Sequence, residues 1–328
     1  MPALLPRVKT TLSIVAHRRV RGWLDGEYRS VFHGKSHDFD DLRPYVPGDE
    51  IRDIDWKATA RHGSPITKRY IASRKQAVMI VVDSGRDLAA VSASGEPKRD
   101  LAVQAAGVLG YLAHRHGDQV GLVTGDAAGS ALVPLGGTEG HLERLLQIIH
   151  ARASLQGSPS DFAGQLDYVA RRFRRRMLLV VISDDQALAG SGHDASGAGS
   201  IGGASTTSGA NARTQNSPGA PASDLRPLLR RLHAQHEMLW VSIADADLVA
   251  ASPRGAELLD VQTFGELPEF LRRDPQVRRE YTERVTAQKT ETRDILDRIG
   301  IMSTRIESTR DVVPKLFRLL ERHNHAGR

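Results

Sequence analysis

The chain has 328 residues and a formal net charge of +6, contains no cysteine, and is 40% hydrophobic but only 5% aromatic. This length allows one large α/β domain or two modest ones, and the lack of cysteine excludes disulfides, thiolate nucleophiles and thiolate metal sites. The N-terminus has no apolar signal-peptide core, and no stretch approaches the roughly 18 apolar residues of a membrane span. We therefore expect a cytoplasmic protein without a membrane span. Its charge permits an acidic partner without demanding nucleic acid.

The first 75 residues are mostly polar, and their apolar segments are short. Residues 1–25 form a basic segment whose weak periodicity predicts one short helix. Residues 26–75 are punctuated by glycine and proline. Aromatic and β-branched residues alternate with charges at 27–33 and 66–73, a pattern typical of strands. We expect 26–75 to be a β-rich extension that precedes the main domain.

Residues 76–328 alternate apolar runs with helical periodicity. Strands are predicted at 77–83, 118–125, 130–136, 176–185, 237–245 and 301–308, and helices at 98–116, 141–150, 161–174, 223–236, 274–300 and 311–323. Because the strands are apolar on both faces, the pattern predicts an α/β fold with a doubly wound, mostly parallel sheet. Residues 190–221 are Gly, Ser and Ala with almost no large apolar residue, which indicates a flexible surface insertion, either inert or regulatory.

Two predicted strands end in acidic residues. Asp83 follows one buried run, and Asp184 and Asp185 follow another. Ligands of doubly wound sheets bind beyond the carboxyl ends of the strands, so a site is expected where these carboxylates meet. The alternative is that Asp83 and Asp184 only accept hydrogen bonds from neighbouring loop amides.

A charged stretch precedes the main domain. Between residues 40 and 62, Arg43, Arg52 and Arg61 stand among Asp49, Asp53 and Asp55. The favoured interpretation is a polar network of bidentate arginine–carboxylate pairs that holds a compact element to the domain, with Trp56 anchored on an apolar patch. The alternative is a two-metal nuclease site in which the three aspartates converge, with Lys57 and His62 nearby.

This stretch, followed by a strand that ends in Asp, resembles the family of domain-of-unknown-function 58 (DUF58) proteins. The residues that carry the match are Gly26, Ser30, Gly34, Phe39, Leu42, Arg43, Tyr45, Gly48, Asp49, Arg52, Ile54, Asp55, Trp56, Ala60 and Arg61. The resemblance implies a von Willebrand factor A-like domain after the extension.

The resemblance also implies a metal-ion-dependent adhesion site. Its usual form is Asp-x-Ser-x-Ser after the first strand, a threonine from a later loop, and an aspartate after the fourth strand. The matching positions here are Asp83, Gly85, Asp87, Ser160 and Asp184. Gly85 has no ligand atom and Asp87 would bind as a carboxylate, so the expected Mg²⁺, Ca²⁺ or Mn²⁺ site is a degraded one.

For function, the resemblance implies a non-catalytic protein-interaction module that works with a MoxR-type AAA+ ATPase in assembling or activating other proteins. The densest basic run, Arg171–Arg176, lies at a predicted helix C-terminus, where cations are favoured by the helix dipole. It is interpreted as a solvated helix end. The alternative is a docking patch for an acidic partner or nucleic acid, although no nucleic-acid partner is expected.

Overall fold

The computed structural model describes residues 3–19, 39–46, 54–70, 75–188, 224–247, 261 and 274–326. Its strands are β1 (Phe39–Pro44), β2 (Ile66–Tyr70), β3 (Ala77–Asp83), β4 (Gln119–Asp126), β5 (Gly129–Gly136), β6 (Leu178–Asp184), β7 (Glu237–Ile243) and β8 (Met302–Ile306). Its helices are α1 (Leu5–Arg19), α3 (Trp56–His62), α4 (Lys98–Arg115), α5 (Glu139–Arg152), α6 (Phe162–Arg172), α7 (Arg226–Gln235), α9 (Pro275–Ile299) and α10 (Thr309–Ala326), and Arg86–Ala89 forms the short 3₁₀ helix η2.

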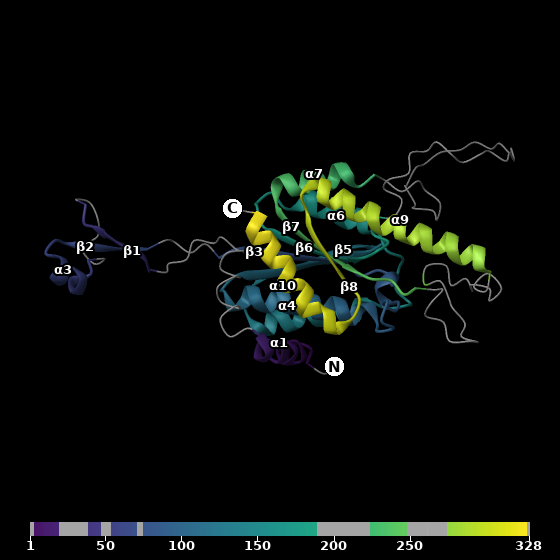
Figure 1. Cartoon of the computed structure of the whole chain (residues 1–328), viewed down its shortest axis with the longest axis horizontal. Coiled ribbons are helices and arrows are strands. Elements are labelled where there is room, and N and C mark those ends of the chain that lie inside the picture. Colours follow the sequence, from purple (N-terminus) through teal and green to yellow (C-terminus); the bar gives the residue numbers. More distant parts are fainter. Residues whose placement is uncertain are drawn as a thin grey trace.

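Six strands form one sheet in the order β5-β4-β3-β6-β7-β8. The pairs from β4 to β8 are parallel, and only β5, at one edge, runs antiparallel to its neighbour β4. Helices cover both faces, with α1, α4 and α10 on one side and α6, α7 and α9 on the other (Figure 1). The predicted doubly wound, mostly parallel α/β fold is confirmed.

The strands are apolar on both faces because each face has its own core. Along β3, Val78, Ile80 and Val82 pack against α4, α5 and α10. The alternate residues Met79 and Val81 pack against α6, α7 and α9. Side chains of a strand point to opposite faces in turn, so a strand between two helical layers needs a continuous apolar run.

Local signals fix where the helices begin. Asp274 accepts hydrogen bonds from the backbone N–H of Gln276 and Val277, which confirms the predicted cap of α9. Thr138 and Asp161 cap α5 and α6 in the same way. The predicted strands and helices after residue 76 all form, with shifts of a few residues at their ends.

The predicted N-terminal helix is confirmed as α1, and it packs on the main domain. Leu5, Val8 and Leu12 are buried in the core that also holds α4, α5 and α10. The proposed domain boundaries stay predictions.

The charged stretch contains a helix that the sequence analysis missed. β1 and β2 pair antiparallel, and α3 lies between them in the chain. The strand predicted at 66–73 is confirmed as β2, whereas β1 was not predicted. Trp56 is 65% exposed, so the expectation that it anchors on an apolar patch is wrong.

Some predictions fall outside the described residues. These are the strand at 27–33, the insertion at 190–221, and the residues Gly48, Asp49, Arg52 and Asp53. Within the part of the chain that the structure describes, no helix is long and apolar enough to cross a membrane.

Candidate functional site

The carboxyl ends of the parallel strands bring acidic side chains together. We call this region the carboxyl edge. It comprises Asp83 after β3, Asp184 and Asp185 after β6, Asp245 after β7, and the loops 84–97 and 153–160. Asp83 and Asp184 are 6% and 7% exposed. Because β3 and β6 are parallel neighbours, the two carboxylates lie at the same edge of the sheet, as the sequence predicts.

Asp83 lies in an unfavourable place for a charge. Its Oδ1 accepts hydrogen bonds from Gly85 N at 3.1 Å and from Gln165 Nε2, on α6, at 3.2 Å. Burial, with the charges of Asp184 and Asp87 adding to it, raises the pKa of Asp83 to about 7. The two hydrogen bonds to the carboxylate lower this pKa, but they do not offset the effect of burial.

The loop that carries Ser160 is tied to the loop after β3. Arg86 N donates to Ser158 O at 3.0 Å, and Arg86 Nε donates to Gly157 O at 3.0 Å. Ser160 lies directly against Gly85, because a Cβ built on Gly85 would be 2.5 Å from Ser160 Cα. The structure therefore brings Ser160 beside the loop that follows Asp83, as expected if Ser160 takes the threonine position of the adhesion-site pattern. It leaves no room for a side chain at position 85.

The sequence analysis missed Lys98, the first residue of α4. It is 2% exposed, and its Nζ donates to Asp184 Oδ2 at 3.0 Å and to Asp245 Oδ1. Burial alone would lower the pKa of Lys98, but the charges of Asp184 and Asp245 outweigh it and raise that pKa. The predicted strand 237–245 also ends in an aspartate, Asp245, and this was the available sequence signal for the second partner of Lys98.

A second ion pair lies beside the first. Arg305, on β8, donates from Nε to Asp185 Oδ1 at 3.0 Å and from a terminal nitrogen to Asp185 Oδ2 at 2.7 Å. The backbone N–H of Asp245 also donates to Asp185, at 3.4 Å. The ends of β6, β7 and β8 are thus held together by charged hydrogen bonds.

The predicted divalent ion stays a prediction, but the donors can be tested for their fit to it. Both oxygens of Asp184 are engaged, Oδ1 by Gln186 N at 3.0 Å and Oδ2 by the Lys98 ammonium. Gly85 supplies no donor, and Ser160 fills the space where a serine would project. No group of three or more His, Cys, Asp or Glu side chains among the described residues has the arrangement of a metal site. Ser160 Oγ is buried without a hydrogen-bond partner among the described residues and can serve as one ligand. A hard divalent cation needs several oxygen ligands, and neither Gly85 nor Asp184 supplies a free one, so the donor set fits such an ion poorly.

Exposed hydrophobic side chains flank the same edge. The large hydrophobic residues exposed in the described parts of the chain are Val46, Trp56, Val91 and Leu155. Val91, which is 51% exposed, lies on the loop that bridges to Asp245 through Ser92. Leu155, 49% exposed, lies on the loop that carries Ser160. Two loops beside the buried polar cluster therefore each carry one exposed apolar side chain.

The other sequence candidates have mainly structural partners. Asp55 caps α3, with its Oδ1 accepting from Lys57 N and Ala58 N at 3.0 Å each. In the basic run, Arg171 pairs with Asp167 and Arg176 with Glu237. The polar network and the nuclease alternative both stay predictions, because Asp49 and Asp53 lie outside the described residues.

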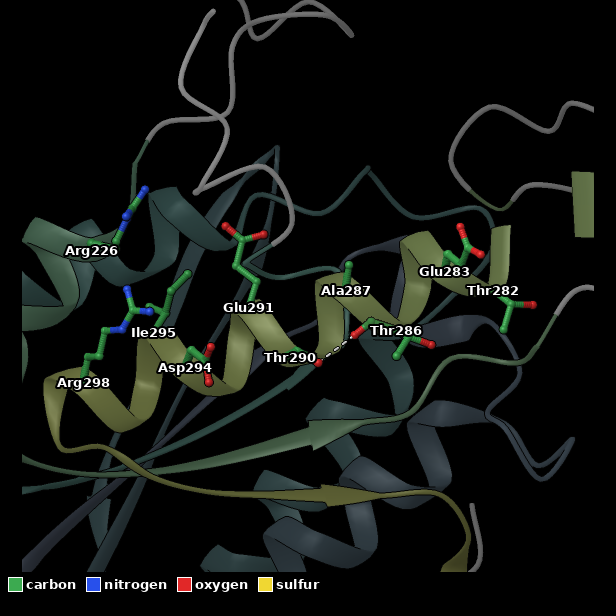
Figure 2. A pocket seen from close by; sticks show the side chains of 10 residues that line it. All are labelled: Arg226, Thr282, Glu283, Thr286, Ala287, Thr290, Glu291, Asp294, Ile295 and Arg298. Atoms are coloured by element: carbon green, nitrogen blue, oxygen red, sulfur yellow. Dashed lines mark hydrogen bonds between the residues drawn. The ribbon is translucent and has the colours of Figure 1, made fainter. Parts of the chain in front are cut away.

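A groove of about 790 Å³ lies apart from these loops (Figure 2). Of the ten lining residues, Arg226 comes from α7 and the other nine come from α9. Thr290 donates to the backbone oxygen of Thr286 within the same helix. Among the described residues, the groove is therefore formed largely by one face of α9, with α7 contributing only Arg226.

Comparison with known proteins bears on the family. The model of the family described as "Protein of unknown function DUF58" matches residues 41–195, and the resemblance to that family is confirmed there. Two similar proteins are the uncharacterized protein Rv1480 of Mycobacterium tuberculosis and the uncharacterized protein Mb1516 of Mycobacterium bovis. Each is 26% identical over 314 residues, which are 94% of this chain and 87% of that protein.

Solved structures with a similar fold include the conserved hypothetical protein BatB from Bacteroides thetaiotaomicron, with 10% identity and a TM-score of 0.40. That match covers 76% of this chain and 99% of BatB. A von Willebrand factor type A protein from Catenulispora acidiphila matches with 8% identity and a TM-score of 0.38, over 77% of this chain and 44% of that protein.

Proposed function

We propose that the chain is a non-catalytic protein-interaction module and that its carboxyl edge is the binding surface. The observation that carries the proposal is the pair of exposed side chains, Val91 and Leu155, on the two loops that surround the buried Asp83–Asp184 cluster. The ion pairs among β6, β7, β8 and α4 keep the loop bases rigid.

A rigid edge suits binding better than chemistry. Asp184 and Asp185 hold an ammonium and a guanidinium, so both carboxylates are engaged by cations of the fold itself. Asp83 is 6% exposed and is held by Gly85 and Gln165. In our proposal the buried carboxylates shape the loops, and the loop side chains contact the partner.

We further propose that the partner is a MoxR-type AAA+ ATPase, as the family resemblance implies. The two would act together in assembling or activating other proteins. The resemblance alone favours a protein over a small molecule as the partner, because the carboxyl edge of such a sheet can bind ligands of either kind.

Binding between the full chain and a purified MoxR-type ATPase of the same organism tests this proposal. Val91→Ser and Leu155→Ser should each weaken binding about tenfold, the loss of roughly 1.4 kcal/mol that a central apolar contact provides. The matched control is Val46→Ser, because Val46 is 52% exposed but lies beside β1 instead of the carboxyl edge. Equal affinity of all three variants and the wild type would place the interface elsewhere.

The nuclease and nucleic-acid alternatives have a separate test. Asp55→Ala should lower the stability of the α3 region, because it removes the cap of that helix. Loss of a nuclease activity in a folded Asp55→Ala variant would favour the enzyme. Affinity for nucleic acid that falls steeply with salt would favour the basic run Arg171–Arg176.

A further inference from the structure

Lys98 occupies an unusual place for a lysine. It is 2% exposed and stands at the first position of α4, at the positive end of the helix dipole. A cation is disfavoured both by burial and by that dipole end. Two carboxylates compensate for it: Asp184 Oδ2, which accepts from Nζ at 3.0 Å, and Asp245 Oδ1.

The ammonium sits on the carboxylate that a divalent ion would need. Asp184 is the late aspartate of the adhesion-site pattern, and its second oxygen already accepts from Gln186 N. A metal ion at this carboxylate would have to displace Lys98 or lie beside its positive charge. Either arrangement costs free energy, because a buried charge interacts strongly with its neighbours.

We propose that the Lys98 ammonium is the built-in cation of the carboxyl edge, and that this edge works without a divalent metal. The inference rests on the proposed function, since it concerns how the same surface is held ready for a partner. One lysine bridges β6 and β7 through Asp184 and Asp245, and places α4 against both.

The proposal has a consequence for partner capture. A metal ion with an open position binds a carboxylate of its partner directly, whereas a 2%-exposed ammonium already engaged by two aspartates has no such position. The partner then contacts the loops around the cluster, and its affinity does not depend on Mg²⁺, Ca²⁺ or Mn²⁺.

The test needs only the full chain and metal salts. Calorimetric titrations with MgCl₂, CaCl₂ and MnCl₂ at millimolar concentration, and unfolding midpoints in EDTA and in each salt, are measured for wild type, Lys98→Met and Lys315→Met. Methionine is unbranched like lysine and only one heavy atom shorter, and it has no charge. Lys315 is the matched control, because it pairs with Asp311 at 3.2 Å on the exposed side of α10.

The wild type and Lys315→Met should show no saturable heat and the same unfolding midpoint in EDTA and in metal. Lys98→Met should unfold roughly 10 °C lower, as expected when one partner of a buried ion pair is removed. Divalent ions should recover part of that loss in Lys98→Met alone, because its carboxylates are left without a counter-charge.

Saturable metal binding by the wild type, abolished by Asp184→Asn, would overturn the proposal. A Lys98→Met midpoint equal to that of the wild type would overturn it as well. If Lys98→Met does not fold, the wild-type titration decides by itself. Because no partner is present in these measurements, a negative result leaves the proposed binding surface to be judged by the Val91 and Leu155 variants.

Discussion

Glu96 caps the last helix of the chain from a position 213 residues earlier. Its Oε2 accepts from Thr309 N, and its Oε1 accepts from Thr309 Oγ1, both at 2.7 Å. A helix begins with unsatisfied N–H groups and a partial positive charge, so a carboxylate at this place stabilises α10. The contact ties the loop 84–97 of the carboxyl edge to the end of β8.

Glu96→Gln should lower the free energy of unfolding by about 1 kcal/mol near neutral pH. Although partial burial opposes it, the hydrogen bonds from Thr309 lower the pKa of Glu96. A carboxyl group with a lowered pKa in the fold contributes stability above its usual value of 4.5, and this contribution disappears as pH falls through the lowered pKa. The difference between variant and wild type should therefore shrink below about pH 4.

Chemical denaturation at several pH values measures this difference. The control is Asp311→Asn, which also removes an acid from the first turn of α10 but one paired with Lys315 at the surface. A difference for Glu96→Gln that stays constant from pH 3 to 8 would contradict the charged cap.

Glu143 holds α1 on the domain. Its carboxylate accepts from Leu4 N at 2.9 Å and from Leu5 N at 2.7 Å. Glu143→Ala should lower the unfolding free energy by about 1–2 kcal/mol, since two backbone donors lose a charged acceptor. Glu139→Ala is the control. Its partner Lys9 is also on α1, but the pair is exposed, so Glu139→Ala should cost less than Glu143→Ala. Equal losses for the two variants would count against the capping role.

The Arg305–Asp185 pair should contribute more than a surface pair of the same residue types. Arg305 contacts both oxygens of Asp185, whose side chain is only 11% exposed. Arg305→Met should cost about 2 kcal/mol, because it leaves a nearly buried carboxylate without its guanidinium partner. Arg293→Met, on the exposed Arg293–Asp297 pair of α9, should cost less than about 0.5 kcal/mol. Urea denaturation of the two variants makes the comparison, and a cost for Arg305→Met no larger than that for Arg293→Met would refute it.

The main domain could be predicted because its signals are local. Apolar runs such as Ala77–Asp83 and Leu178–Asp184 are long and continuous, and Asp274 with Pro275 marks a helix start. The convergence of Asp83 and Asp184 followed from the parallel arrangement alone, since carboxyl ends of parallel strands share one edge.

The sequence analysis missed a short helix without apolar periodicity and a residue whose partners are distant in sequence. α3 has seven residues and no buried side chain, so no apolar periodicity announces it. Lys98 belongs by sequence to an ordinary amphipathic helix, and its burial depends on Asp184 and Asp245, which lie 86 and 147 residues away. A contact between residues so far apart in the chain cannot be derived from a local sequence pattern.

Gly85 tests whether the adhesion-site pattern can be restored. The family pattern places serine at this position, and Gly85→Ser would supply the missing hydroxyl. A Cβ there would lie 2.5 Å from Ser160 Cα and 2.7 Å from Ser160 N, so the backbone of the neighbouring loop must move. That loop is held by the hydrogen bonds from Arg86 to Ser158 and Gly157.

Gly85→Ser should therefore lower the unfolding free energy by about 1–3 kcal/mol, the usual cost of overpacking, and should gain no saturable Mg²⁺ binding. The control is Gly140→Ser on α5, where an added Cβ meets nothing within 4 Å. Thermal unfolding and calorimetry with MgCl₂ measure both effects. If Gly85→Ser is as stable as the wild type and binds Mg²⁺ saturably, the loops are adaptable, and the glycine alone, rather than the Lys98 ion pair, keeps a metal from this edge.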